Sequence, residues 1–397
     1  MQPSPYTPGE IARTVPGRGE LIEEFTERLS ILVDLQRLIG RINVAYGERG
    51  IGKTSLLRAY QRIAEERGVL CIWVTAGETS GLVTQIVDAI REATATWPKA
   101  AATAVRERLD QISVTIGVPG LASVTARTSP SAEVREGIGA RDVERLIRVV
   151  TEDRNRVRAL ILFVDEVQSA DAQGIRTIAY AWQHLQAEAP STPAALFAAG
   201  LPNAPEQIAD AVTFSERFAY RPLEMLSIGA QVAALRDPAA ELGVAWDVEA
   251  LERAAELSAG YPYAVQLYGD AAWSAAGRPD PGLTISSAHV ATAQRSVDRD
   301  LRNLFAARWA NTTPNQRRFL IALAWLQGGA EPVDRSALAD LLRVNSRSLS
   351  SVRAHLIAKG LIRAEGHGQV RIPIPGFVQW IRDSEERPGR TRRPDAR

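Results

Sequence analysis

Residues 42–54 read Ile-Asn-Val-Ala-Tyr-Gly-Glu-Arg-Gly-Ile-Gly-Lys-Thr, and this stretch decides the fold. Its apolar start, 42–46, predicts a buried strand, and the Ser-Leu-Leu that follows at 55–57 predicts the start of a helix. Between them the residues keep the G-x-x-x-x-G-K-T spacing. Such a loop lets backbone N–H groups surround a phosphate, and the helix N-terminus adds the positive end of its dipole. The stretch predicts a phosphate-binding loop rather than a chance glycine-rich turn.

Each position of this loop has an expected role toward a nucleotide. Lys53 would reach the β- and γ-phosphates, and the Thr54 hydroxyl would ligate Mg²⁺. The chain has three lysines and forty-four arginines, so a lysine at this position indicates a need for a compact point charge. The expected cofactor-binding residues of the loop are Gly47, Glu48, Arg49, Gly50, Ile51, Gly52, Lys53, Thr54 and Ser55.

A second motif lies about 110 residues later, where the apolar run 159–164 ends in Asp165 and Glu166. The run predicts a buried parallel strand, and ligands of open α/β sheets bind at the carboxyl ends of such strands. Asp165 would hold Mg²⁺ together with Thr54. Glu166 would orient and deprotonate an attacking water, which hydrolysis needs beyond binding.

A third strand, 194–200, is followed by Asn203, which would contact the γ-phosphate or the water; a turn or capping asparagine is the alternative. Further along, 215–223 predicts a helix end and a short fifth strand. Arg217 or Arg221 would serve there as an arginine finger toward the nucleotide of a neighbouring subunit. A surface salt bridge is the competing interpretation.

The amino-acid composition limits the classes of protein to which the chain can belong. Hydrophobic residues at 45% and charged residues at 23% of 397 indicate a soluble globular chain of two or three domains. The single cysteine, Cys71, excludes an intrachain disulfide and a cysteine-based metal cluster. The N-terminus does not resemble a signal peptide, and no apolar run approaches the length of a membrane span. We expect a cytoplasmic protein without a membrane partner.

Charge is distributed unevenly although the net charge is only +1. Residues 301–397 carry 17 basic and 8 acidic side chains, whereas the first 300 residues carry 30 and 38. The excess of basic over acidic side chains in 301–397 indicates that this part of the chain binds a polyanion. The alternative is a basic surface that contacts only solvent.

The periodicity divides the chain into five segments. Within the core, helices are expected over 21–39 and 82–110, a strand over 69–75, and a β-hairpin over 111–127 that serves either for contact or for packing. Alanine-rich helices over 230–236, 248–259 and 263–274 predict a small helical lid. The expected segments are a flexible N-terminus (1–14), an α/β core (15–225), the lid (226–297), a third domain (298–381) and a disordered basic tail (382–397).

The third domain has the order of a winged helix. Helices and a turn at 343–345 precede a helix over 346–359, and a hairpin over 360–374 follows. The apolar stripe of helix 346–359 leaves a short basic face for the DNA major groove, although winged helices also pack against proteins. The candidate DNA-binding residues are Arg347, Ser350, Arg353 and Lys359.

The order of these motifs resembles the AAA+ superfamily, near the archaeal and eukaryotic replication initiators and the bacterial STAND and transposition-regulator ATPases. The resemblance rests on four features: Walker A (47–54), Walker B (160–166), the sensor-1 strand (194–203) and Arg217 as the box VII arginine. The segment 15–21 is similar to the loop that packs on adenine, which implies a nucleotide contact for Arg18. At the start of the lid, Gly260-Tyr261-Pro262 stands where initiators have a sensor-2 arginine. This Gly-x-Pro pattern is more similar to that of STAND ATPases, and the similarity implies a nucleotide contact for Pro262.

The resemblance implies an α/β fold: a P-loop AAA+ core with a parallel sheet, a helical lid and a C-terminal winged helix. It implies ATP and Mg²⁺ as cofactors, a homo-oligomer, and ATP hydrolysis that controls assembly on duplex DNA, with Glu166, Lys53, Asn203 and Arg217 as catalytic residues. The alternative is a STAND-like nucleotide-dependent switch or adaptor that acts on a protein partner.

Overall fold

The computed structural model of the chain describes residues 1–77, 80–116, 139–154, 156–329, 331–366 and 368–386. It divides into two compact units. The sheet unit comprises Arg18–Tyr46 and Lys53–Pro222, and the helical unit comprises Met1–Gly17, Gly47–Gly52 and Leu223–Arg397. The glycine-rich loop 47–52 therefore groups with the helical unit, whereas Lys53 begins a stretch of the sheet unit.

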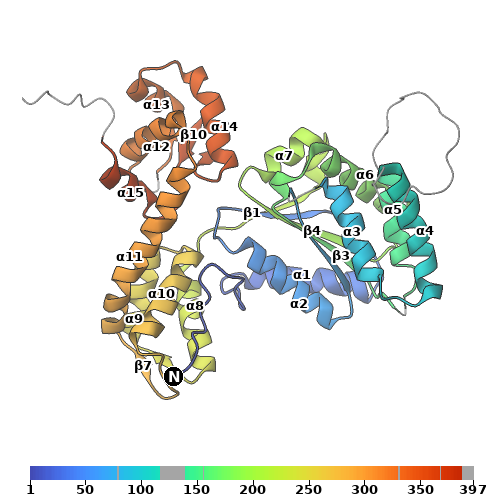
Figure 1. Cartoon of the computed structure of the whole chain (residues 1–397), viewed down its shortest axis with the longest axis horizontal. Helices are drawn as coiled ribbons and strands as arrows, with labels where there is room; N and C mark the ends of the chain where they lie inside the picture. The colour runs from blue at the N-terminus through green and yellow to red at the C-terminus, as the bar shows by residue number, and fades with distance from the viewer. Residues whose placement is uncertain (78–79, 117–138, 155, 330, 367, 387–397) are drawn as a thin grey trace, which may run out of the picture. The chain divides into compact units, whose positions relative to one another are not determined.

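The sheet unit is built on five parallel strands in the order β2-β3-β4-β1-β5. Figure 1 shows three of them, β3, β4 and β1, side by side. Strand β1, which precedes the glycine-rich loop, lies between β4 and β5. The expected α/β fold with a parallel sheet is confirmed. The strands are β1 (Asn43–Tyr46), β2 (Leu70–Thr75), β3 (Leu160–Asp165), β4 (Ala194–Gly200) and β5 (Ala219–Pro222).

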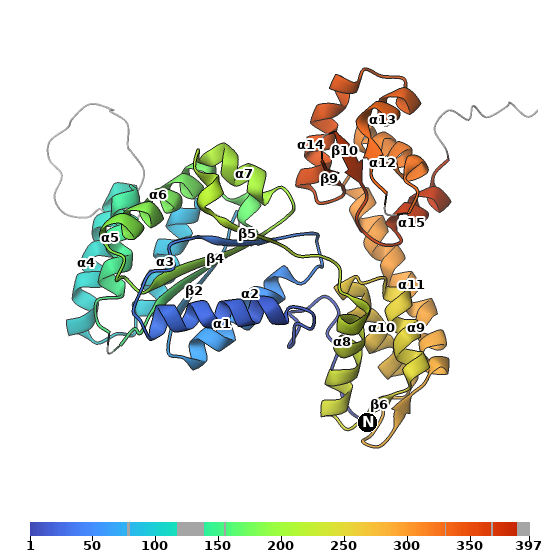
Figure 2. The same ribbon diagram turned by 180° about the vertical axis from the view of Figure 1, so that it is seen from behind.

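Helices cover both faces of this sheet (Figure 2). One face carries α1 (Gly19–Val33) and α2 (Lys53–Glu66), and the other carries α3 (Leu82–Thr94) and α6 (Ala172–Glu188). Strand β3 is consequently buried at every position. This burial on both faces explains why its sequence is continuously apolar up to Asp165.

Aromatic rings fix α1 and α2 on their face of the sheet. Phe25 of α1 stacks on Tyr60 of α2 with ring centroids 4.2 Å apart. Both rings also pack edge-on against Phe197 of β4, at 5.1 and 5.5 Å. Aromatic pairs of this kind contribute about 0.5–1.5 kcal/mol each beyond the apolar area they bury. The cluster thereby positions α2, whose first two residues are Lys53 and Thr54.

Two expectations for residues 82–127 are wrong. The helix expected over 82–110 is interrupted, because α3 ends at Thr94 and α4 (Lys99–Ile116) begins after Pro98. Proline has no N–H and disfavours helix in the residue before it, which explains the break. The first part of the expected hairpin, 111–116, is the end of α4, so its alternating apolar pattern belongs to a helix. The remainder, 117–127, lies outside the described residues.

The part of the helical unit that starts at Leu223 contains four lid helices that share one core. Strands β6 (Ala245–Trp246) and β7 (Thr284–Ile285) form a short parallel pair within it. The three expected lid helices are therefore present, and a fourth follows them. They are α8 (Ile228–Glu241), α9 (Val248–Ser258), α10 (Pro262–Ala275) and α11 (Ser287–Ala310).

The N-terminal segment is anchored to the lid, contrary to the expected flexible segment 1–14. The side chain of Tyr6 is 2% exposed. Its hydroxyl donates to the Leu235 carbonyl and accepts a hydrogen bond from Trp246 Nε1 at 2.9 Å. The Tyr6 ring also contacts Trp246 and Trp273 edge-on, with centroids 6.3 Å from each. A single aromatic residue in a proline-rich segment was not recognised as an anchor.

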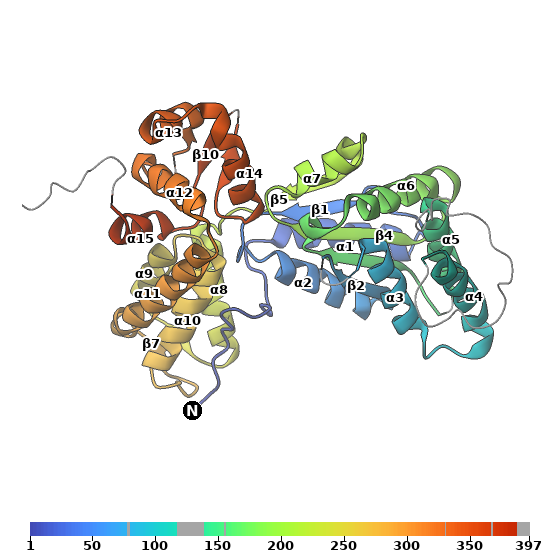
Figure 3. The same ribbon diagram turned by 45° about the horizontal axis from the view of Figure 1, so that its top comes forward.

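Helix α11 serves two cores, because Val297 packs in the lid and Phe305 packs in the C-terminal module. Figure 3 shows α11 beside α9 and α10. The expected boundary at 297–298 thus lies inside one 24-residue helix. Within the part of the chain that the structure describes, no helix is both long and apolar enough to cross a membrane.

The C-terminal module combines helices with the antiparallel sheet β8-β10-β9. It continues past the expected boundary at 381, because α15 extends to Ser384 and Arg382 donates to the carbonyls of Ala324 and Gln327, each at 2.7 Å. Its elements are α12 (Pro314–Leu326), β8 (Val333–Asp334), α13 (Arg335–Leu342), the 3₁₀ turn η3 (Ser346–Leu349), α14 (Ser350–Ala358), β9 (Arg363–Glu365), β10 (Gln369–Arg371) and α15 (Phe377–Ser384).

Candidate functional site

The glycine-rich loop has a backbone conformation suited to anions. Gly50 has φ +81° and Gly52 has φ +93°, values that side-chain-bearing residues rarely adopt. Between them, the Ile51 N–H donates to the Glu48 carbonyl at 3.3 Å, which tightens the turn. Alternating left- and right-handed residues form concave nests of N–H groups that bind phosphate. This geometry supports the role predicted for 47–52.

Tyr261, at the start of α10, holds this loop from within the helical unit. Its side chain is 1% exposed, and its hydroxyl donates to the Arg49 carbonyl at 2.9 Å. A Cβ on Gly50 would lie 2.5 Å from the Tyr261 hydroxyl, so glycine is required there for space as well as for backbone conformation. Because C=O and N–H point in opposite directions in a trans peptide, fixing the Arg49 oxygen turns the Gly50 N–H away from Tyr261.

Arg308 of α11 supports the same tyrosine. Its guanidinium donates to the Tyr261 hydroxyl at 3.3 Å. Burial raises the pKa of Tyr261, and Arg308 acts in the opposite direction, so the hydroxyl stays protonated and able to donate. Pro262 is the residue predicted at this motif, whereas Tyr261 and Arg308 are not predicted by the sequence pattern. Pro262 is the first residue of α10 and half-buried, and the bulky aromatic between Gly260 and Pro262 was the available signal.

In the sheet unit, Lys53 and Thr54 form the first turn of α2, where the helix dipole is positive. The side chains of Lys53 and Ser55 are buried, at 6% and 8% exposed. A buried ammonium at a helix N-terminus favours a nearby anion strongly. Arg18 lies at the N-cap of α1, where its carbonyl accepts from the Ile22 N–H at 3.0 Å.

Thr54 and Asp165 lie together at the carboxyl edge of the sheet. The Thr54 hydroxyl donates to Asp165 Oδ2 at 2.7 Å, and the Glu166 N–H donates to Asp165 Oδ1 at 2.9 Å. Burial raises the pKa of Asp165, although both hydrogen bonds act against that shift. A hydroxyl and a carboxylate are oxygen ligands of the kind that Mg²⁺ prefers. These two residues therefore fit the metal-binding role predicted for them.

Glu166 follows β3 in a left-handed conformation, with φ 52°. Its carboxylate accepts a hydrogen bond from Gln168 Nε2, and Gln168 Oε1 accepts from the Leu201 N–H at 2.8 Å. The ends of β3 and β4 are thus joined through one side chain. Sequence reasoning assigned Glu166 and missed Gln168, which lies two residues beyond it in the 3₁₀ turn η1 (Val167–Ser169).

Asn203 lies at the N-cap of α7 (Ala204–Ala211), but its side chain makes no capping hydrogen bond. The residue is 6% exposed, and among the described residues its Oδ1 has no hydrogen-bond partner. A buried amide oxygen without a partner is uncommon in folded proteins. This observation favours the predicted contact with water or phosphate over the capping alternative.

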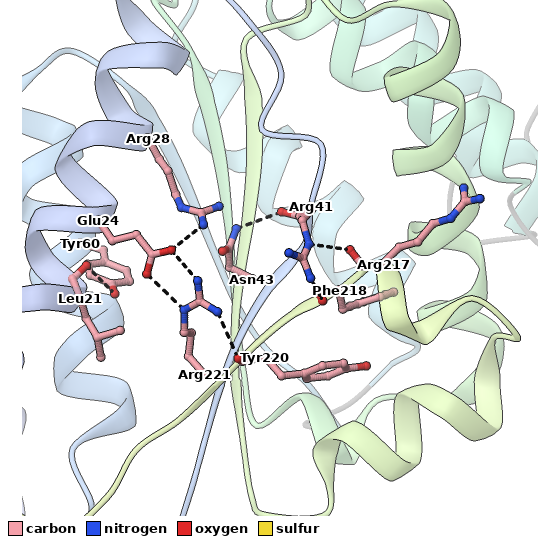
Figure 4. A network of polar contacts seen from close by, with 10 residues as sticks. All are labelled: Leu21, Glu24, Arg28, Arg41, Asn43, Tyr60, Arg217, Phe218, Tyr220 and Arg221. Atoms are coloured by element: carbon pink, nitrogen blue, oxygen red, sulfur yellow. Dashed lines mark hydrogen bonds and ion pairs between the residues drawn. The ribbon is translucent and has the colours of Figure 1, made fainter.

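The two candidate finger arginines differ in their surroundings (Figure 4). Arg221 on β5 forms an ion pair with Glu24 of α1 at 2.5 Å, and its hydrogen bond lowers the pKa of Glu24 to about 2. Arg217, in the 3₁₀ turn η2 (Ser215–Arg217), is exposed, and its guanidinium points away from this network (Figure 4). Arg41 holds the Arg217 backbone by donating to its carbonyl at 3.2 Å. Arg217 is therefore the better placed of the two to reach another chain.

The four candidate DNA-binding residues are not equivalent. Arg347 and Ser350 are exposed, and Arg353 is half-buried. Lys359, in contrast, donates from Nζ to the Asn311 carbonyl at 2.6 Å and to Gln316 Oε1 at 2.9 Å. The Lys359 ammonium thus ties α14 to the start of α12.

Comparison with known proteins identifies the first part of the chain. Residues 14–192 match the AAA ATPase domain family. These residues form an AAA ATPase domain. The AAA+ assignment made from the sequence motifs is thereby confirmed. Residues 302–381 match a family described as a domain of unknown function, DUF8462, and the winged-helix interpretation of this module stays a prediction. A comparison with curated proteins gave no match.

Two of the solved structures that are similar to this chain share its fold over most of its length. The Walker-type ATPase PABY2304 of Pyrococcus abyssi is 14% identical, with a TM-score of 0.58 covering 96% of this chain and 99% of the other. The ORC2 protein of Aeropyrum pernix, solved as ADPNP and ADP complexes, is 17% identical, with a TM-score of 0.55 covering 94% and 95%. At these identities the likeness is one of fold.

Proposed function

We propose that this AAA protein binds and hydrolyses ATP and that its nucleotide state controls assembly on duplex DNA. The observation that carries the proposal is the hydrogen bond between Thr54 and Asp165, with Glu166 as the next residue. It brings a metal-binding pair and a candidate general base to one edge of the sheet, at the first turn of the helix that follows the phosphate loop.

The mechanism is one of positioning and electrostatics. The N–H groups of the loop and the Lys53 ammonium bind the phosphates, and Thr54 and Asp165 are the residues that would hold Mg²⁺. When bound there, Mg²⁺ would supply positive charge against the charge that develops on the phosphate oxygens. Glu166 orients a water for in-line attack and accepts its proton, and Asn203 contacts the γ-phosphate or that water.

Two variants separate binding from hydrolysis. Lys53→Ala removes a phosphate contact and should weaken binding of a fluorescent ATP analogue severely. Glu166→Gln keeps the shape of the side chain but cannot accept the proton, so it should bind ATP normally and hydrolyse it about 100-fold more slowly or worse. Wild-type protein that binds no ATP, or a Glu166→Gln variant that hydrolyses at the wild-type rate, would overturn the proposed mechanism.

Charge and exposure in the C-terminal module support DNA as the partner. Residues 301–381 carry 11 basic and 4 acidic side chains. Arg347, in the 3₁₀ turn η3, and Ser350, the first residue of α14, are exposed in the segment proposed to enter the major groove. The exposed Arg217 supports a homo-oligomer in which it reaches the nucleotide of a neighbour.

A second candidate is a nucleotide-dependent switch or adaptor that acts on a protein. It is favoured by basic residues of the module that are used internally: Arg363 pairs with Glu224 at 3.3 Å, and Lys359 donates to Asn311 and Gln316. DNA affinity measured against salt separates the two functions, because only phosphate contacts release counterions.

A further inference from the structure

Gln168 joins the ends of two strands in the proposed catalytic edge of the sheet unit. Its Nε2 donates to the Glu166 carboxylate, which lies just past β3, and its Oε1 accepts from the Leu201 N–H, just past β4, at 2.8 Å. Nε2 also lies 3.4 Å from Ser169 Oγ. Both ends of the amide are thus engaged.

The chemistry of these contacts requires an amide. The Leu201 N–H has left the ladder of the sheet and needs an acceptor, which the Gln168 oxygen provides. The nitrogen of the same group then donates to the Glu166 carboxylate, an acceptor that makes a stronger hydrogen bond than a neutral one. A glutamate at 168 would set two carboxylates against each other, and a leucine would leave both Leu201 and Glu166 without this partner.

The surrounding backbone makes room for this side chain. A Cβ on Gly200 would lie 2.9 Å from Gln168 Oε1 and 2.7 Å from the Ala204 Cβ, so glycine at 200 admits the amide between the strand ends. Glu166 has a left-handed φ of 52°, which costs a non-glycine residue free energy and persists only where neighbouring contacts hold it. Gln168 supplies one of those contacts.

We propose that Gln168 is a positioning residue for hydrolysis, which holds the Glu166 carboxylate toward the attacking water and links it to the 201–203 segment that carries Asn203. The inference rests on the proposed ATPase function. A contact of Asn203 with phosphate or water would then affect the position of the Glu166 carboxylate. The connection runs through the Leu201 N–H and the side-chain amide of Gln168. ATP binding itself does not depend on Gln168, because its hydrogen bonds go to Glu166, Leu201 and Ser169.

The test measures the catalytic rate and nucleotide affinity of Gln168→Leu separately. We expect kcat to fall about 10- to 100-fold, as for a misplaced catalytic group, while the Kd for a fluorescent ATP analogue stays within about two-fold of wild type. Gln173→Leu is the matched control, since Gln173 is an exposed glutamine at the start of α6, and it should change neither quantity. Thermal unfolding checks that both variants are folded.

A double variant decides whether Gln168 acts through Glu166. In a Glu166→Gln background, Gln168→Leu should lower the residual rate by less than about two-fold, because the group that it positions is already disabled. An unchanged or increased kcat in the single variant, an equal loss of affinity, or a full additional loss in the double variant would overturn the inference. Each of these results leaves the proposed ATPase function standing, which the Lys53→Ala and Glu166→Gln variants test independently.

Discussion

The strand ends of the sheet unit and the surface of the C-terminal module arrange their polar residues differently. At the strand ends Thr54 is hydrogen-bonded to Asp165, and Glu166 is hydrogen-bonded to Gln168. On the C-terminal module, Arg347 and Ser350 are exposed to solvent. Hydrogen-bonded side chains suit a small ligand whose reacting atoms must be placed accurately. Exposed side chains suit a large polyanion that binds along a surface.

This difference predicts how substitutions in the two regions should behave. Loss of a tied residue at the strand ends disturbs its partner too, so effects there should be large and confined to nucleotide chemistry. Loss of an exposed basic residue removes one contact among several, so its effect should be modest and should depend on salt.

The largest effect is expected for Asp165→Asn. The substitution removes the charged metal ligand and keeps the shape of the side chain, so we expect Mg²⁺-dependent ATP hydrolysis to fall about 100-fold or more. Asp153→Asn is the control, because Asp153 is an exposed aspartate outside the strand ends. Hydrolysis at the wild-type rate by Asp165→Asn would remove the metal-binding pair from the mechanism.

An intermediate effect is expected for Tyr261→Phe. The substitution keeps the ring but releases the Arg49 carbonyl, so the loop loses one constraint on the Gly50 N–H. We expect the Kd for the ATP analogue to rise about three- to ten-fold, in line with one buried hydrogen bond. Tyr263→Phe, on the same helix and half-buried, should leave affinity unchanged. Equal affinities for wild type and Tyr261→Phe would show that the loop does not need this contact.

A smaller, salt-dependent effect is expected for Arg347→Ala. If Arg347 contacts phosphate, its loss should weaken DNA binding a few-fold and reduce the slope of log affinity against log salt by about 1. Lys359→Met tests the contrast, because it breaks the ties of Lys359 to Asn311 and Gln316. That variant should lower the melting temperature and leave the salt slope intact. A changed salt slope in Lys359→Met together with an unchanged slope in Arg347→Ala would contradict this assignment. It would make Lys359, and not Arg347, the residue that contacts DNA.

The smallest effect is expected for Glu24→Gln. The Glu24 carboxyl is partly exposed, and the hydrogen bond from Arg221 lowers its pKa from 4.5 to about 2. The ion pair therefore stabilises the fold above about pH 4.5, and this contribution is lost as the pH falls toward 2. Because solvent screens the pair, Glu24→Gln should lower the free energy of unfolding by at most about 1 kcal/mol at pH 7. Urea unfolding should show this difference shrinking at pH 3, and a difference that grew there would contradict the assignment.

Much of the fold could be predicted from the sequence because its signals are local. The apolar runs of β1, β3 and β4 and the glycine spacing of the loop each lie within a few residues, and the AAA+ motifs link them in order. The strand ends could therefore be expected to bring Asp165 near the first turn of α2, and Thr54 indeed bonds to Asp165.

The missed features depend on contacts between distant residues. Tyr261 reaches Arg49 across 212 positions, and Tyr6 meets Trp246 across 240. Neither residue has a local pattern that distinguishes it from an ordinary aromatic. Lys359 shows the converse, because charge on a helix indicates a surface until the internal acceptors on Asn311 and Gln316 are seen. The error at 111–116 arose because an alternating apolar pattern over six residues fits a strand as well as a helix end.

The most direct test of the account is the affinity for labelled duplex DNA measured against salt, with an ATP analogue and with ADP. We predict tighter binding with the ATP analogue, a fall of about 0.9 log units per log unit of salt for each phosphate neutralised, and loss of the nucleotide difference in Lys53→Ala. Binding that is the same with either nucleotide, or absent even at low salt, would contradict the claim that the nucleotide site controls assembly on DNA.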